Sequence, residues 1–232
     1  PKCPTIRSIW KRNMKSDKSN LTVRYADGRD TDALYKLWKE CFHDTDAFMA
    51  YYFDYYLRDN RILILEQENQ LKSMIHLNPY TLSVCEKKVN SLYVVGVATD
   101  ADFRHRGAMT QLLQRTFSDC YAGRIPLIYL MPANEAIYTP FQFAYIYSQY
   151  VEKKTNTPFS SIHNVDAAIV RDISAHPVSV EAERQQLADW SNSLLSRHYD
   201  VFTWRDAYYF ERLQMENQAD GGDLLLLSAN GK

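Results

Sequence analysis

The chain has 232 residues, 46% of them hydrophobic, which is enough to bury the core of one large domain or two smaller ones. The net charge of -1 argues against nucleic acid as a partner, and no apolar run is long enough to span a membrane. The four cysteines are scattered with no Cys-x-x-Cys pair, which favours free thiols in a reducing cytoplasm over disulfides or a metal site.

The first segment, residues 1–20, carries six Lys or Arg against one Asp. It contains no apolar stretch typical of a signal peptide. We interpret it as a basic leader that is solvated and partly frayed, with a basic docking arm as the alternative.

Residues 21–151 are predicted to form one domain that begins with a strand and two helices. Alternating apolar residues indicate a strand over Leu21–Tyr25. Apolar stripes at three-four spacing indicate one helix after Asp30 or Thr31 and a second from Asp44 or Thr45. The second helix carries aromatic rings on several faces, which favours packing between two layers or, alternatively, a ring-lined substrate groove.

Most of the sheet is expected to follow these two helices. The predicted strands are Arg61–Glu66, Leu71–Leu77, Thr81–Cys85, Lys88–Thr99, Ile125–Leu130 and Tyr145–Val151. A helix is predicted directly after Gly107, and a short helix capped by Asn134 precedes the last strand. The order predicts an α+β or α/β fold in which helices flank a mixed, mostly antiparallel sheet.

After a polar linker at 152–164, the second half repeats this opening order in 165–232. Strands are predicted over Val165–Ile173 and Asp223–Leu227, with two helices between them that begin after Ser179 and Thr203. The phrase Ala50-Tyr51-Tyr52-Phe53-Asp54 returns as Ala207-Tyr208-Tyr209-Phe210-Glu211, which favours a duplication.

The C-terminal sequence predicts a partial second domain. Asn230-Gly231 is a strong hairpin signal, but only Lys232 follows it. We therefore expect the 232 residues to be an N-terminal part of a longer protein. The alternative is a naturally short chain whose last strand pairs elsewhere.

The stretch 91–121 concentrates the features of a ligand site. Gly96 inside a strand indicates a bulge or a close backbone approach, and Gly107 permits unusual dihedrals where the helix begins. Arg104, His105 and Arg106 precede that helix, and no acidic residue lies between Phe103 and Ser118. A positive helix start with free N–H groups is an anion site, most naturally for a phosphate.

Val97-Ala-Thr-Asp-Ala-Asp-Phe-Arg-His-Arg-Gly-Ala-Met109 resembles the acetyl-CoA motif of the GNAT superfamily of N-acetyltransferases. Arg104 and Gly107 match the pattern, whereas Met109 replaces a small residue, as is typical of the enhanced-intracellular-survival (Eis-like) branch. Glu135-Ala-Ile-Tyr-Thr-Pro-Phe-Gln-Phe143 resembles that branch's second motif, with Gln142 in place of a glycine. The branch has two tandem acetyltransferase folds and a sterol-carrier-like domain, consistent with the repeat.

The resemblance implies acetyl-CoA as co-substrate and a set of residues that bind it. That set is Val97, Ala98, Thr99, Arg104, His105, Arg106, Gly107, Ala108, Met109, Thr110 and Asn134. The helix start would bind the pyrophosphate, and a backbone N–H near Val97 would stabilise the oxyanion. The resemblance also implies Tyr138 as general acid, and a packing tyrosine is the alternative.

The general base stays open: Glu135, Asp100 and His76 are candidates by chemistry alone, and each could be structural or solvated. We expect transfer of acetyl to a primary amine, either an aminoglycoside-like polyamine or a lysine side chain. The alternative is an acetyl-CoA-binding sensor or scaffold without turnover. No metal, membrane or nucleic acid is expected, and the full-length protein is compatible with a homo-oligomer.

Overall fold

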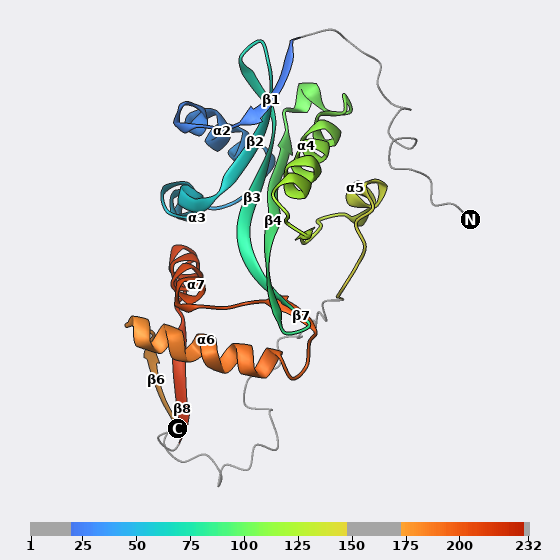
Figure 1. The fold of residues 1–232 in the computed structure, drawn as a ribbon. Helices are drawn as coiled ribbons and strands as arrows, with labels where there is room; N and C mark the ends of the chain where they lie inside the picture. The colour runs from blue at the N-terminus through green and yellow to red at the C-terminus, as the bar shows by residue number, and fades with distance from the viewer. Residues whose placement is uncertain (1–19, 148–172, 230–232) are drawn as a thin grey trace, which may run out of the picture.

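A six-stranded sheet carries the fold, with strand order β1-β2-β3-β4-β5 and β7 added on β3 (Figure 1). The strands are β1 (Leu21–Tyr25), β2 (Arg61–Gln67), β3 (Gln70–Val84), β4 (Lys87–Thr99), β5 (Leu127–Tyr129) and β7 (Val201–Thr203). Neighbouring strands are antiparallel except β4 and β5, which run parallel. This computed structural model describes residues 20–147 and 173–229, and its mixed, mostly antiparallel sheet is the predicted one.

Helices cover both faces of the sheet (Figure 1). One face carries α2 (Thr31–Cys41) and α3 (Asp46–Asp54), and the other carries α4 (Ala108–Ala122) and α5 (Glu135–Tyr138). Short 3-10 turns flank them at Gly28–Asp30, Tyr56–Asp59, Ala101–Phe103 and Thr139–Phe141. Because side chains alternate along a strand, β2 supplies Ile64 to the core under α2 and α3, and Leu63 and Leu65 to the core under α4.

The aromatic residues of α3 are mainly core residues, as the packing interpretation predicted. Met49, Tyr51 and Tyr52 are buried, and so is Tyr56 in the following turn. Thr45 caps the helix, since its side chain accepts a hydrogen bond from the Phe48 N–H. The aromatic side chains thus join α3 to the sheet and to the second half of the chain.

Strand β3 is one continuous strand of 15 residues, whereas the sequence predicted a break between Leu71–Leu77 and Thr81–Cys85. Pro79, which has no N–H group, lies in the interval that was predicted as a break. The structure tolerates it because β2 pairs with β3 only as far as Leu77, and β7 pairs with it only from Leu82. Pro79 therefore lies where β3 has no partner strand on that edge.

The second half forms a two-stranded antiparallel sheet of β6 (Ile173–Pro177) and β8 (Leu225–Ala229), with α6 (Glu181–Leu195) and α7 (Ala207–Ala219). The prediction that Thr203 begins a helix is wrong, because Thr203 ends β7 and Asp206 caps α7 by accepting from the Tyr209 N–H. The predicted strand at Val165–Ile173 lies outside the described residues apart from Ile173, where β6 begins.

Helix α7 packs against α3, so the two copies of the repeated phrase lie on contacting helices (Figure 1). The Tyr51 hydroxyl donates to the Arg212 carbonyl oxygen at 2.9 Å, and the Tyr208 hydroxyl donates to Asp59 at 2.7 Å. The two hydrogen bonds connect the first half of the chain to the second half through a tyrosine of each phrase.

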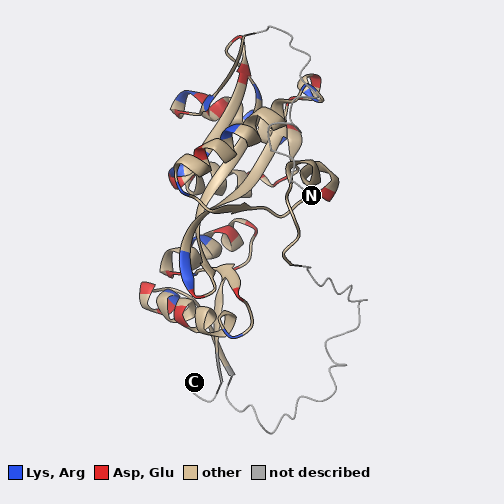
Figure 2. Cartoon of the chain, turned by 45° about the vertical axis from the view of Figure 1, so that its right-hand side comes forward, with Lys and Arg blue, Asp and Glu red and all other residues tan. Residues whose placement is uncertain are grey.

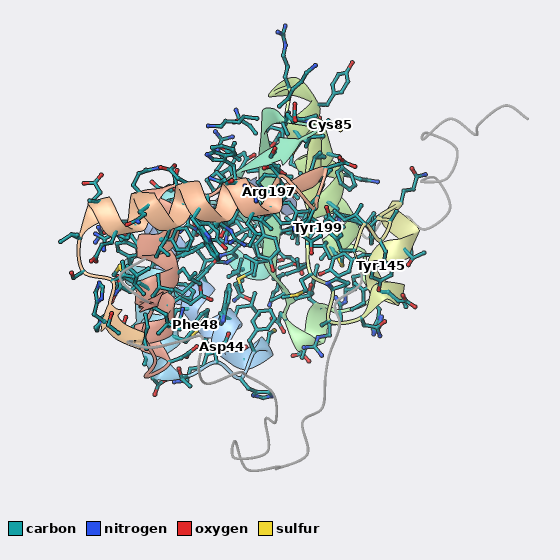
Figure 3. All side chains as sticks on the ribbon, turned by 90° about the horizontal axis from the view of Figure 1, so that it is seen from below. Asp44, Phe48, Cys85, Tyr145, Arg197 and Tyr199 are labelled. Carbon is teal, nitrogen blue, oxygen red and sulfur yellow. The ribbon has the colours of Figure 1, made fainter. Side chains whose placement is uncertain are left out.

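The β3–β4 turn lies beside β7 (Figure 1). Figure 3 labels Cys85 in this turn and Tyr199, which precedes β7. The Cys85 N–H donates to the Asp200 carbonyl oxygen at 2.7 Å, and the Trp204 N–H donates to that of Thr81 at 2.9 Å. Residues 145–147 form no strand, and 148–151 of the predicted last strand lie outside the described residues. So do most of the basic leader and the linker at 152–164.

Charged residues of both signs are interspersed over the helices of both halves (Figure 2). Among the described residues, no helix is long and apolar enough to cross a membrane, and no three His, Cys, Asp or Glu side chains are grouped to hold a metal ion. The described cysteines, Cys41, Cys85 and Cys120, are free thiols.

Candidate functional site

Strand β4 contains a bulge at Gly96, as the sequence predicted. Met74 of β3 pairs with Ala98 of β4, but His76 pairs with Val95, so β4 holds one extra residue between these pairs. The bulge reverses the direction of the side chains. Val95 and Ala98 both pack under α2 and α3, although they are three positions apart and would lie on opposite faces of a regular strand.

Only glycine fits at position 96. Its φ is +58°, in the left-handed region, and a Cβ atom there would lie 2.3 Å from Cζ3 of Trp38 and 3.1 Å from Cδ2 of His76. The Trp38 ring is fixed, since it is 3% exposed and its Nε1 donates to Asp44 at 2.8 Å. Close packing against an indole ring thus maintains the bulge.

The edge of β4 beyond the bulge has no partner strand within the described residues. Strands β4 and β5 pair only from Ser91 to Tyr93 of β4, opposite Leu127 to Tyr129. After Tyr129 the chain leaves the sheet toward α5 (Figure 1). The predicted residues Val97, Ala98 and Thr99 therefore lie on a strand edge that can pair with an extended ligand.

The loop between β4 and α4 brings the predicted basic residues together at the surface. Arg104, His105, Arg106 and Gly107 are all exposed. The Arg104 Nε donates to the Thr99 carbonyl oxygen at 3.3 Å, and the Arg106 guanidinium lies 5.2 Å from the centre of the Phe103 ring. His105 has a φ of +62°, an uncommon backbone conformation for a residue with a side chain.

Helix α4 begins at Ala108, directly after Gly107, whose φ of +80° takes the left-handed region. No side chain caps this helix, and its first turn holds no acidic residue. Its first N–H groups, at Ala108, Met109 and Thr110, have no acceptor within the helix. Met109 is half-buried against the core beneath α4. The helix start therefore offers free donors and a partial positive charge to an anion.

Helix α5 places Tyr138 on the same side of the sheet as α4 (Figure 1). Tyr138 is half-buried, with its ring 5.7 Å from that of Phe143, and burial followed by the neighbouring Tyr93 raises its pKa. Asn134 caps the helix by accepting from the Ala136 N–H at 3.0 Å. Gln142, which stands in place of a glycine, takes the left-handed conformation with a φ of +65°.

The three candidate bases lie in different surroundings. Asp100 is bound by Lys72, 3.1 Å away, and this hydrogen bond lowers the pKa of its carboxyl. His76 is fully buried beside the bulge, with Nδ1 hydrogen-bonded to the Tyr52 hydroxyl at 3.1 Å, and burial lowers its pKa to about 3. Glu135 is exposed on α5, three residues before Tyr138.

One cavity of about 660 Å³ lies apart from all of these residues, and none of the predicted site residues lines it. It lies beside Pro79 and Tyr80 and is lined on another side by Tyr208 and Arg212 of α7. In the sequence, Arg212 is marked only by its place directly after the repeated phrase.

A family model described as an acetyltransferase (GNAT) domain matches residues 22–146. A predicted acetyltransferase with acetyl-CoA from Clostridium acetobutylicum aligns at 19% identity and a TM-score of 0.50, over 58% of this chain and 96% of that one. A glucosamine-6-phosphate N-acetyltransferase from Arabidopsis thaliana aligns at 13% identity and a TM-score of 0.47, over 57% and 97% of the two chains.

A probable N-acyltransferase from Enterococcus faecalis V583 aligns at 16% identity and a TM-score of 0.49, over 52% of this chain. The aligned part spans only 31% of that longer protein. No curated protein matches the sequence significantly.

Proposed function

Because the chain belongs to the GNAT acetyltransferase family, we propose that it transfers the acetyl group of acetyl-CoA to a primary amine. The observation that carries the proposal is the uncapped start of α4, with its adjacent arginines, next to the free edge of β4. Hydrogen-bond donors that can bind an anion, next to an unpaired strand edge, suit a substrate that carries phosphates on an extended arm.

Acetyl-CoA would bind with its pyrophosphate at the start of α4. The N–H groups of Ala108, Met109 and Thr110 would donate to it, and Arg104 and Arg106 would add charge-assisted hydrogen bonds. Met109 fits this role although its side chain is large, because it packs into the core and leaves its N–H at the helix start. His105 would contribute a further donor, and Asn134 would fix the start of α5.

The bulge at Gly96 would supply the oxyanion donor. As the amine nitrogen attacks the thioester carbonyl carbon, the carbonyl oxygen becomes negative, and the N–H of Val97 would stabilise it. The C–S bond then breaks and CoA leaves as a thiolate. One such donor is worth about 3–4 kcal/mol of transition-state stabilisation.

Tyr138 would donate a proton to the departing thiolate. Its raised pKa keeps the phenol protonated at neutral pH, and a phenol matches a thiolate of similar basicity. The attacking ammonium group must lose a proton first. Among the three candidate bases we propose Glu135 for this step, since Asp100 is paired with Lys72 and His76 is closed off from solvent.

For the acceptor we propose an aminoglycoside-like polyamine or a lysine side chain in a cytoplasmic protein. We further propose the Eis-like branch, with 165–232 as part of a second GNAT-like domain. The order β6, α6, α7, β8, with β6 antiparallel to β8, supports this assignment because β1, α2, α3 and β2 follow the same order. The short strand β7 interrupts the second set.

Replacing Tyr138 by Phe tests the mechanism. Thiol release from acetyl-CoA over a panel of amines should fall about 100-fold or more, while the affinity for acetyl-CoA stays unchanged. Tyr121→Phe is the matched control, because Tyr121 is 90% exposed at the far end of α4. Wild-type turnover in Tyr138→Phe would remove Tyr138 from the mechanism. Wild-type binding of acetyl-CoA without thiol release for any amine would instead favour a sensor module.

A further inference from the structure

The cavity of about 660 Å³ occupies the gap in the sheet between β2 and β7. Its floor is the stretch of β3 around Pro79 and Tyr80, where no strand pairs with that edge. Aromatic residues from both halves line it, namely Tyr25, Tyr56, Tyr80, Trp204, Tyr208 and Tyr209. A volume of this size, with aromatic rings and charged groups in its lining, is typical of sites for small organic ligands.

Arg212 of α7 lines this cavity with a buried cationic group. The residue is 8% exposed, and its guanidinium stacks 3.7 Å from the centre of the Tyr56 ring and 5.4 Å from those of Tyr80 and Tyr208. Its Nη2 atom is buried with no hydrogen-bond partner. A planar cation beside several rings, with one unsatisfied donor atom, is an incomplete binding site.

Within the described residues, Arg212 has no carboxylate at ion-pair distance. Asp59 accepts from the Tyr208 hydroxyl at 2.7 Å, and Asp206 accepts from the Tyr209 N–H at 2.7 Å as the cap of α7. The carboxyl of Glu216, one turn after Arg212, has a raised pKa, because burial and then Asp220 raise it by more than Arg212 lowers it. A buried cation without a counter-ion is destabilising, so a bound anion would complete the site.

The other charges of the cavity select the kind of anion. The carboxylates of Asp59, Asp119, Asp206 and Glu216 also line it, and so does one further cation, Arg61. Because the carboxylates outnumber the two arginines, a dianionic phosphate would meet more repulsion there than a single carboxylate. The surrounding rings favour a ligand with an apolar or aromatic body. One guanidinium donor face matches one carboxylate.

We propose that this cavity binds a small monocarboxylic acid, with the carboxylate on Arg212 and the apolar body among the tyrosines and Trp204. The site is separate from the proposed acetyl-CoA site, since the two share no residue. It lies between the acetyltransferase domain and the second half, so an acid bound there would contact both.

A matched ligand pair tests the site in the full chain without acetyl-CoA. N-acetylphenylalanine carries the carboxylate and a ring, and its amide differs only in lacking the charge. Neither has a free amine, so neither can act as an acetyl acceptor. With ¹⁵N-labelled tryptophan, the indole resonance of Trp204 reports on the cavity, while Trp38 in the core and Trp190, 64% exposed on α6, serve as internal controls.

The acid should produce a saturable shift of the Trp204 resonance alone, and the amide should bind at least about tenfold more weakly. Arg212→Gln should remove this difference, whereas Glu216→Gln, one turn further on, should bind the acid no more weakly than wild type. Thermal unfolding checks that both variants fold. Equal binding of acid and amide to wild type, or no shift with either, overturns the proposal. Tighter binding of inorganic phosphate than of the acid overturns the choice of a monocarboxylate.

Discussion

Gly96→Ala is the substitution for which the structure specifies the cost in most detail. The new methyl group would lie 2.3 Å from the Trp38 ring, far inside van der Waals contact, and the backbone would keep a φ of +58°. The ring cannot move aside easily, because it is 3% exposed and its Nε1 is hydrogen-bonded to Asp44. The change therefore adds backbone strain and overpacking at the same residue.

The two costs can be estimated separately. A residue with a side chain in the left-handed region costs about 1–2 kcal/mol relative to glycine. An extra methyl group in a well-packed core costs about 1–3 kcal/mol. We therefore expect Gly96→Ala to lower the free energy of unfolding by about 2–5 kcal/mol. With a urea dependence of about 2 kcal/mol per molar, the unfolding midpoint should fall by about 1–2.5 M.

Gly107→Ala is the matched control, since its φ is +80° but no atom lies within 4 Å of the added methyl group. Gly107→Ala should therefore show only the cost of the backbone strain. Gly28→Ala has neither a left-handed φ nor a close contact, so it should change the midpoint little. Urea unfolding followed by circular dichroism compares the three variants. If Gly96→Ala lowers the midpoint no more than Gly107→Ala, the contact with Trp38 does not maintain the bulge.

Three further predictions concern stability and protonation. Burial and the hydrogen bond to Asp119 raise the pKa of Tyr25 to about 12, and burial raises the pKa of Tyr56 to about 12. Because both phenols ionise more easily in the unfolded chain, the urea midpoint should fall as the pH rises from about 10 to 12. A constant midpoint over this range would contradict the prediction. Because burial lowers the pKa of His76 to about 3, its ring should stay neutral at pH 5, as NMR would show. The free energy of unfolding should fall as the pH drops below about 6.5, where the same ring takes up a proton in the unfolded chain. Titration of the ring near pH 6.5 in the folded protein would show instead that it is solvated. Thr45→Ala should lower the free energy of unfolding in urea by about 1 kcal/mol, because the cap of α3 is lost. Thr45→Ser keeps a capping hydroxyl and should lower it by less. Equal stability of the two variants would contradict the capping role.

Local sequence signals predicted the parts of the fold that local chemistry determines. The bulge at Gly96 and the helix after Gly107 follow from the residues at those sites, and Asn134 and Thr45 cap the helices that they were expected to cap. The candidate phosphate loop could be identified for the same reason, since its basic residues and the helix start are neighbours in the chain.

Features that depend on distant pairing could not be predicted this way. The sequence does not show that β3 continues through Pro79, because this depends on which edge of β3 lacks a partner. Strand β7 has only three residues and pairs with β3 more than 100 residues earlier in the chain. As a charged helix residue, Arg212 would be expected at the surface. It is buried because the turn after α3 and strand β3 bring Tyr56 and Tyr80 next to it.

Titration of the chain with acetyl-CoA by calorimetry tests the central claim most directly. We predict saturable binding of one acetyl-CoA per chain, weakened about tenfold or more in both Arg104→Ala and Arg106→Ala, because each removes a charge-assisted hydrogen bond to phosphate. Arg124→Ala, at the exposed far end of α4, should bind like wild type. No binding of acetyl-CoA, or equal loss in Arg124→Ala, would contradict the assignment of the α4 start as the acetyl-CoA site.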